Sequence, residues 1–200
     1  MEVAVVHRII EQHAATRGET LAIVCGQEAA TYRELNVRAN GMARHFMQIG
    51  LRRGGHATVT LAHGLDLAAV LLAVLKAGAS YTWIAGSGCI RSVAISGQYT
   101  EESTPAHVVD LTPVLGEPLG SGPNLPVLTR ATDTATVIGG LSGGSPMLVP
   151  HETLAALRRP AVAARPQLWD GDPSTFDLWT GLLSGATLSV ESAPALINAA

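Results

Sequence analysis

A chain of 200 residues is long enough to bury a hydrophobic core, and a composition of 47% hydrophobic and 14% charged residues is typical of a globular protein. The net charge of -3 offers no basic surface for nucleic acid or anionic lipid, so neither partner is expected. The longest apolar run is far shorter than the roughly 20 residues of a membrane-spanning helix. The N-terminus also lacks a secretory-signal pattern, and we therefore expect a cytoplasmic protein.

The first 85 residues predict an alternation of helices and strands. Thr31 and Glu34 have the spacing of a capping box, and the apolar stripe that follows ends by Gly50, so a helix is expected there. Apolar periodicity and glycine stop signals define the neighbouring elements. The other predicted helices span 3–15 and 66–77, and the predicted strands span 21–24, 57–61 and 81–84.

The pattern weakens between residues 86 and 133, and the turn-rich stretch 116–124 predicts a loop. Regular elements then resume. A strand over 134–138 and a Gly/Ser-rich turn precede a helix near Glu152, a strand over 166–169, a helix over 176–183 and a strand over 187–190. This order predicts an α/β fold with a parallel or mixed sheet flanked by helices. We divide the chain into a first α/β subdomain (1–115), a linker (116–133) and a second α/β segment (134–200).

Lysine and cysteine are both scarce in this sequence. Lys76 is the single lysine among 13 basic residues, which excludes chemistry that needs a lysine elsewhere in the chain. Cys25 and Cys89 lack the spacing of metal ligands, so we expect reduced core residues and no metal site.

Four stretches, in order, resemble the adenylation domains of nonribosomal peptide synthetases, members of the adenylate-forming AMP-binding superfamily. They are TYRELNVRAN (31–40), LLAVLKAGASY (71–81), TATVIGGLSGGSPMLVPHETL (134–154) and GDPSTFDLWTGLLSGATLSV (171–190). The resemblance covers about residues 3–190 and implies the N-terminal α/β body of that fold. In the family the catalytic apparatus continues beyond this part, so we expect a truncated domain that is inactive alone.

The resemblance places a phosphate loop after the strand at 134–138. Glycine and hydroxyl residues let backbone N–H groups face a phosphate, while the family's lysine adds a full charge. Here Met147 stands in the place of that lysine and the loop is about three residues shorter. We therefore expect no firmly bound cofactor and at most weak binding of ATP and Mg²⁺, with an ordinary strand-to-helix turn as the alternative. The residues of this degenerate loop are Ser142, Gly143, Gly144 and Ser145.

Two further positions match the family's substrate pocket. Asp172 corresponds to the aspartate that binds the ammonium group of an amino-acid substrate, and Gly171 replaces the adjoining phenylalanine. His151 corresponds to the histidine that begins the helix after the phosphate loop. The alternatives are an ordinary Gly-Asp-Pro turn for Asp172 and a capping or packing role for His151.

The segment GLSGG (140–144) also fits the G-x-S-x-G pattern of a serine hydrolase. That fold requires an acid and then a histidine after the serine. Here the last histidine, His151, precedes Asp170, Asp172 and Asp177, so the chain order argues against a hydrolase.

The function expected from these features is a structural or protein-interaction role for a catalytically incomplete adenylation-like domain in nonribosomal peptide (antibiotic) biosynthesis. The alternatives are a split amino-acid-activating subunit that works with a second polypeptide, and an excerpt from a longer chain. Truncation would leave Leu188 and Val190 exposed or covered by a partner, so we expect a homodimer or a hetero-complex with a peptide synthetase component or a second adenylation fragment.

Overall fold

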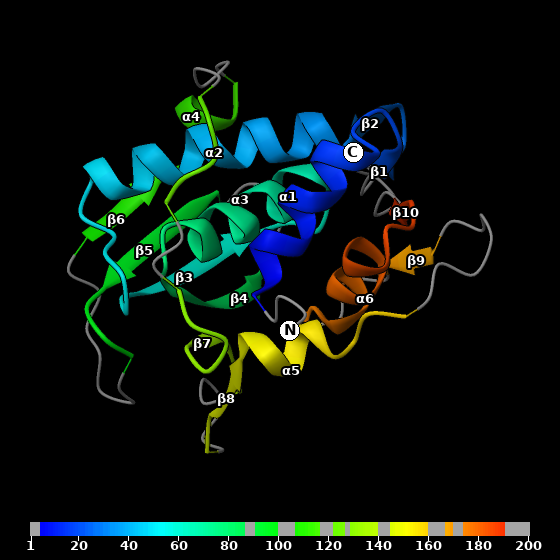
Figure 1. The fold of residues 1–200 in the computed structure, drawn as a ribbon. Helices are drawn as coiled ribbons and strands as arrows, with labels where there is room; N and C mark the ends of the chain where they lie inside the picture. Colours follow the sequence, from blue (N-terminus) through cyan, green and yellow to red (C-terminus); the bar gives the residue numbers. More distant parts are fainter. Residues whose placement is uncertain are drawn as a thin grey trace, which may run out of the picture.

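The computed structural model arranges the chain as two sheets with helices packed against them (Figure 1). It describes residues 5–86, 91–99, 107–116, 122–126, 129–139, 145–159, 167–169 and 174–190. The six helices of this part are α1 (Val6–Thr16), α2 (Tyr32–Gln48), α3 (Leu65–Lys76), α4 (Thr112–Gly116), α5 (His151–Ala155) and α6 (Phe176–Ser184). The predicted α/β fold class is confirmed.

The larger sheet has six strands in the order β6-β5-β3-β4-β7-β8. Its central strands β3, β4 and β7 are parallel, whereas β5 and β8 run antiparallel to their neighbours. The bounds are β6 (His107–Asp110), β5 (Ser92–Ser96), β3 (His56–Leu61), β4 (Ser80–Ala85), β7 (Thr134–Ile138) and β8 (Met147–Pro150).

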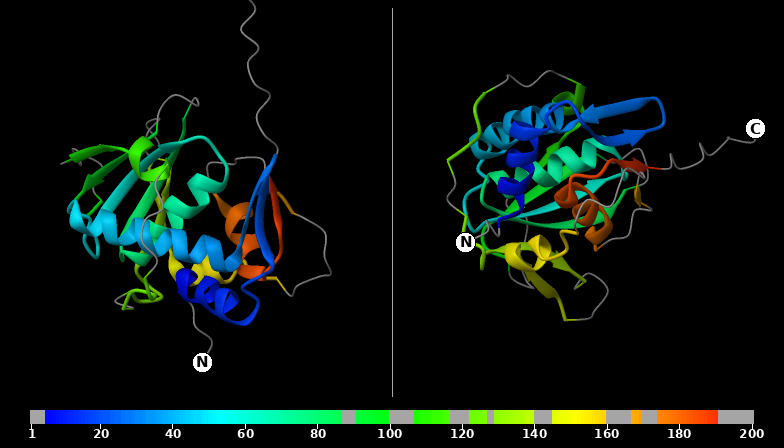
Figure 2. Two further views of the ribbon diagram at one scale, coloured as in Figure 1. Left: turned by 90° about the horizontal axis from the view of Figure 1, so that it is seen from above. Right: turned by 45° about the vertical axis from the view of Figure 1, so that its right-hand side comes forward.

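The smaller sheet has four strands in the order β2-β1-β10-β9, of which β1, β10 and β9 are parallel. The bounds are β2 (Glu28–Thr31), β1 (Leu21–Cys25), β10 (Leu188–Val190) and β9 (Gln167–Trp169). Strand β10 comes from the end of the described chain and lies beside β1 from its beginning (Figure 2). This sheet therefore joins segments that are more than 160 residues apart in the sequence.

The helix α3 contacts strands of both sheets and packs along α2. Every residue of α3 from Leu67 to Lys76 is buried, which explains why its sequence is apolar on all sides rather than along one stripe. The amphipathic helix α2 buries the stripe predicted for it, and its capping box is present: the Glu34 N–H donates to Thr31 Oγ1 at 3.2 Å, and the Thr31 N–H donates to Glu34 Oε2 at 2.8 Å. The predicted helices at these two places are confirmed.

The structure contains five elements that the sequence pattern did not predict: β2, β5, β6, α4 and β8. All five have four or five residues, and such short runs carry little periodicity. Three of the strands, β2, β6 and β8, lie at sheet edges, where only one side is paired and exposed side chains are tolerated.

The expectation that Leu188 and Val190 would be exposed or covered by a partner is wrong. Strand β10 pairs with β1 on one side and β9 on the other, and helix α6 packs against it. The side chains are 0% and 4% exposed. The chain itself therefore covers these two residues.

Strands from both sides of residues 116–133 enter common sheets, because β7 pairs with β4 and β10 pairs with β1. The division of the chain into 1–115, 116–133 and 134–200 stays a prediction. No helix in the described part of the chain combines the length and apolar character needed to cross a membrane.

Candidate functional site

The candidate site lies where the carboxyl ends of strands from the two sheets meet. The indole of Trp83 near the end of β4 lies 6.1 Å, centroid to centroid, from that of Trp169 at the end of β9. His63, two residues after β3, contacts the edge of the same Trp169 ring at 6.1 Å. In open α/β sheets the carboxyl ends of parallel strands form the usual ligand crevice. The chain segments that match the family motifs of the phosphate loop and Asp172 both follow this edge.

A directed chain of buried hydrogen bonds fixes the start of α6 against β4. The Trp179 indole N–H donates to the Tyr81 hydroxyl at 2.7 Å, and that hydroxyl bonds Thr175 Oγ1 at 2.6 Å. Thr175 Oγ1 in turn donates to the carbonyl of Ser174 at 2.6 Å, so the Tyr81 hydroxyl is the donor to Thr175. Burial raises the pKa of Tyr81, which keeps the phenol protonated.

Thr175 adopts a left-handed backbone conformation, with φ 58° and ψ 13°, although it is a β-branched residue and fully buried. Such a residue is strained in this region, and the strain persists because Tyr81 holds its hydroxyl. The sequence Gly171-Asp172-Pro173 immediately precedes this anchored turn. The anchor therefore fixes the downstream end of the segment in which the family carries its substrate-binding aspartate.

The site residues Gly171 and Asp172 lie outside the described residues, and so do Ser142, Gly143 and Gly144. Their roles stay predictions. Ser145 is described and exposed, and it reaches back to Gly139: its carbonyl oxygen lies 3.9 Å from where a Cβ on Gly139 would be. Gly139 has φ +80°, a conformation that favours glycine.

The loop between Gly139 and Ser145 joins two antiparallel strands. Ile138 of β7 pairs with Met147 of β8, and Thr134 pairs with Pro150. The expected strand-to-helix turn is therefore wrong, because residues 147–150 extend the sheet before α5 begins at His151. A nucleophile elbow requires a strand-to-helix turn at its serine. The hairpin thus adds a geometric argument against a serine hydrolase.

Neither Met147 nor the single lysine supplies a positive charge to this loop. Met147 carries a thioether and is 52% exposed on β8. Lys76 is fully enclosed at the C-terminal end of α3, where its ammonium lies 2.5 Å from Glu11 Oε1. Because α3 runs back from the end of β3 to the start of β4, Lys76 lies toward the opposite, amino edge of the sheet. Burial lowers the pKa of Lys76, and the bond to Glu11 opposes that shift.

His151 is the first residue of α5; it packs against α1 and is 1% exposed. Its Nδ1 accepts a hydrogen bond from the Val6 N–H at 3.4 Å, and its ring meets the His7 ring edge-on at 6.0 Å. Burial lowers the pKa of His151 to about 4, with the charge of Asp133 opposing the shift, so the imidazole is neutral at pH 7. These contacts are those of a packing residue that joins two helices, and a role in a substrate pocket stays a prediction.

A cavity of about 160 Å³ opens at the same carboxyl edge, between the ends of β1 and β3. Cys25 and His63 line it, together with Asp66, which binds Arg38 at 2.5 Å. Cys25 is a free, half-buried thiol, and Cys89 lies outside the described residues. Among the described side chains, no group of three or more His, Cys, Asp or Glu could hold a metal ion.

Sequence reasoning missed the residues that shape this site. The sequence pattern predicts Tyr81 as the end of LKAGASY and the start of a strand, and it assigns no site role to Trp83, Thr175 or Trp179. Tyr81 bonds Thr175 and Trp179 over more than 90 positions, and Trp83 contacts Trp169 over 86, which no local pattern reveals. The one available signal was tryptophan, since Trp83 and Trp169 lie at or near the ends of predicted strands.

In a comparison with known protein families, residues 10–87 match the family of AMP-binding enzymes. The chain is 27% identical over 219 aligned residues to surfactin synthase subunit 2 of Bacillus subtilis, covering 97% of this chain and 6% of that protein. It is 40% identical over 76 residues to gramicidin S synthase 1 of Brevibacillus brevis, covering 38% of this chain and 7% of that protein. The chain thus spans a small fraction of these relatives.

Solved structures share the fold. NpsA-ThdA, an artificially fused adenylation-PCP di-domain from Klebsiella oxytoca, matches 95% of this chain and 40% of its own length, with a TM-score of 0.75 at 18% identity. The N-terminal subdomain of NpsA in complex with 3-hydroxybenzoyl-AMSN matches 93% of this chain and 53% of its own, with a TM-score of 0.71 at 20% identity. The resemblance to the N-terminal part of an adenylation domain is confirmed.

Proposed function

We propose that this chain, with the sequence features and fold of the N-terminal part of an adenylation domain, serves in nonribosomal peptide synthesis and does not adenylate a substrate by itself. Its relatives include surfactin synthase subunit 2 and gramicidin S synthase 1. The observation that carries the proposal is the charge of the phosphate loop. Met147 occupies the expected lysine position, and Lys76 is held by Glu11 inside the helical layer.

The absence of a lysine ammonium from the loop should weaken the binding of ATP. A hydrogen bond to a charged partner contributes about 1.5 to 3 kcal/mol, and its loss weakens binding by about one to two powers of ten. Backbone N–H groups alone are partial charges that compete with water for the phosphates. We expect ATP with Mg²⁺ to bind with a Kd of about 1 mM or weaker.

Two measurements test this function. Incubation of the purified chain with each amino acid, ATP and labelled pyrophosphate should give no exchange above background, and robust exchange would contradict the proposal. Calorimetry with ATP and Mg²⁺ should show no saturation in the low micromolar range.

Two substitutions to lysine test whether the loop lacks only its positive charge or lacks the whole phosphate site. Met147→Lys restores the family residue, whereas Leu148→Lys adds the same charge at the adjacent, equally exposed position. We expect neither variant to bind ATP tightly or to exchange pyrophosphate. Activity gained by Met147→Lys alone would show that the loop is complete apart from its lysine.

A second candidate is a split amino-acid-activating subunit that works with another polypeptide. The observation in its favour is the intact anchor at Tyr81, Thr175 and Trp179, which fixes the turn after Asp172. Mixing the chain with the other synthetase proteins of its own operon should then yield pyrophosphate exchange, which Asp172→Asn should abolish. The absence of any gain on mixing would leave the structural role. The protein-interaction role, the cytoplasmic location and the possibility that the sequence is an excerpt from a longer chain stay predictions; the genomic reading frame around codon 200 tests the last of them.

A further inference from the structure

A second, larger pocket of about 560 Å³ lies at the amino edge of the six-stranded sheet. Gly54 and Gly55 precede β3, whereas Ser80 and Thr134 are the first residues of β4 and β7. Because these strands are parallel, the pocket lies at the end of the sheet opposite the candidate site. Its volume is in the range of about 300–1,000 Å³ that is usual for small-molecule sites.

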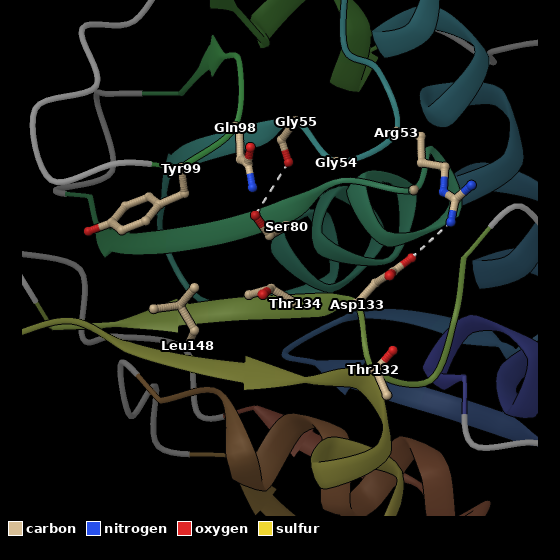
Figure 3. A pocket seen from close by; sticks show the side chains of 11 residues that line it. Arg53, Gly54, Gly55, Ser80, Gln98, Tyr99, Thr132, Asp133, Thr134 and Leu148 are labelled. Atoms are coloured by element: carbon tan, nitrogen blue, oxygen red, sulfur yellow. Dashed lines mark hydrogen bonds and ion pairs between the residues drawn. The ribbon is translucent and has the colours of Figure 1, made fainter.

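One end of the pocket holds a pair of opposite charges. Arg53 and Asp133 approach each other across it, with Nη2 and Oδ2 3.4 Å apart (Figure 3). Their side chains are 44% and 34% exposed, and an exposed single contact of this length contributes little to stability. Both groups are therefore available to a ligand that carries the complementary charges.

The two charged side chains are held in place from behind. Asp133 Oδ2 accepts the Arg130 N–H at 2.9 Å, and the backbone of Asp133 bonds both Arg130 and His151. Gly78, with φ +81°, lies under the stem of Arg53, and a Cβ there would be 3.3 Å from Arg53 Cγ. The fold thus presents a guanidinium and a carboxylate at fixed neighbouring positions.

The middle of the pocket is polar and backed by a buried imidazole. Ser80 Oγ donates to the carbonyl of Gly55 at 3.3 Å and lies 2.9 Å from Nδ1 of His56. Ser80 Oγ and His56 Nδ1 share a hydrogen bond whose donor is set by the imidazole tautomer. His56 is 2% exposed, and its Nε2 has no hydrogen-bond partner among the described residues. The Ser80 side chain is therefore held in the pocket wall by its contacts with Gly55 and His56.

The opposite end of the pocket is aromatic and aliphatic. Tyr99 and Leu148 lie there, away from Arg53 and Asp133 (Figure 3). The Tyr99 ring is held edge-on against His56, with ring centroids 4.8 Å apart. The side chain of Leu148 is 52% exposed, so it offers apolar surface that a ligand could cover.

We propose that this pocket binds a zwitterionic α-amino acid with an aromatic or large aliphatic side chain. The ligand carboxylate would pair with Arg53, its ammonium with Asp133, and its side chain would lie between Tyr99 and Leu148. A fork of guanidinium donors suits a carboxylate, and charge-assisted hydrogen bonds are the strong ones. The site is separate from the segment that contains Asp172, and the inference does not rest on the proposed function.

The test is a calorimetric titration of the full 200-residue chain with L-phenylalanine as the probe. We expect saturable binding with a Kd of about 1 mM or tighter. Arg53→Gln and Asp133→Asn should each weaken it at least about tenfold. The asparagine variant keeps an oxygen that accepts the Arg130 N–H, so the turn is retained. Arg52→Gln is the matched control, because Arg52 bonds the carbonyls of Met47 and Leu51 outside the pocket and should leave the affinity unchanged.

Two truncated ligands assign the ends of the amino acid. 3-Phenylpropanoate lacks the ammonium, so its weaker binding should respond to Arg53→Gln and not to Asp133→Asn; 2-phenylethylamine should show the reverse. The absence of saturation up to about 10 mM L-phenylalanine would overturn the proposal. Binding that is lost in Asp172→Asn but kept in Arg53→Gln would also overturn it and would support the split-subunit function instead.

Discussion

At the scale of single residues, the pair of Lys76 and Glu11 is the most enclosed ion pair that the described residues form. Its side chains are 0% and 5% exposed and lie 2.5 Å apart. Glu11 also lies 3.5 Å from Arg8, whose side chain is 46% exposed. The single lysine of the chain therefore joins α3 to α1.

Lys76→Met should destabilise the fold by about 3 to 5 kcal/mol, because it leaves the buried Glu11 carboxylate with only the solvent-exposed Arg8 as an ion-pair partner. Urea denaturation measures the loss. The matched control is Arg33→Met, which breaks the exposed pair with Glu19 and should cost less than about 1 kcal/mol. The double variant Glu11→Leu/Lys76→Met should recover much of the stability, since no buried charge remains. A loss within 1 kcal/mol for Lys76→Met would contradict this account.

Buried histidines, three of which have strongly lowered pKa values, make stability depend on pH. Burial lowers the pKa of His7 to about 3, with the His151 and Lys76 charges acting in the same direction, and lowers that of His56 to about 4. His151 is also lowered to about 4. The unfolded chain takes up protons at these groups below pH 6.5, whereas the folded chain does so only near pH 3 to 4.

Since the unfolded state binds more protons in this window, the free energy of unfolding should fall as the pH is lowered from 6.5 toward 4. Each unit of pKa difference corresponds to about 1.4 kcal/mol. Urea midpoints at several pH values measure the slope. His7→Gln should flatten it, whereas His107→Gln, on an exposed edge strand, should leave it unchanged. Equal slopes in all three proteins would refute the assignment to His7.

At the scale of elements, the junction between α6 and β4 decides how the segment after β9 is placed. Trp179, Tyr81 and Thr175 form one directed hydrogen-bond chain through a fully buried region. The strained backbone of Thr175 depends on it. Helix α6, which packs on β9 and β10 of the four-stranded sheet, is thereby also attached to β4 of the six-stranded sheet.

Tyr81→Phe should destabilise the protein by about 1 to 3 kcal/mol, because the Trp179 N–H loses its acceptor in a dry environment. Thermal or urea denaturation measures the change. Tyr99→Phe removes a phenol from the half-buried pocket wall and should change stability by less than about 0.5 kcal/mol. If both variants were equally stable, the hydrogen-bond chain would have no structural role.

At the scale of the whole molecule, apolar side chains remain exposed on three edge strands, among them Val108 on β6, which is 62% exposed. Leu168 on β9 is 55% exposed, and Met147 and Leu148 on β8 are each 52% exposed. Unpaired edges with apolar side chains favour association. The predicted dimer or hetero-complex thus keeps a physical basis, although Leu188 and Val190 do not supply it.

Leu168→Lys should reduce self-association of the purified chain, because it places a charge on the open edge of the smaller sheet. Light scattering over a range of concentrations measures the mean mass. Thr20→Lys, which adds the same charge at an exposed loop position, should leave the association unchanged. A monodisperse monomer at high concentration in the unmodified chain would disprove the predicted association.

The sequence by itself determined the long elements and the resemblance to adenylation domains. Apolar periodicity located α1, α2 and α6, because a helix of nine or more residues repeats its buried face several times. A long apolar run that stops at a glycine located α3. The capping box at Thr31 was predicted because it depends only on residues three positions apart. That Met147 stands in the place of the family's phosphate-loop lysine stays a prediction from the resemblance.

Only the tertiary structure decided which short segments become strands and which residues meet. Strand β8 forms because β7 offers it an edge, and Val190 is buried because β1 and β9 enclose β10. The pocket at Arg53 and Asp133 unites residues 80 positions apart. Local patterns contain no information on such pairings, because they arise when the packing of α3 brings distant strands side by side.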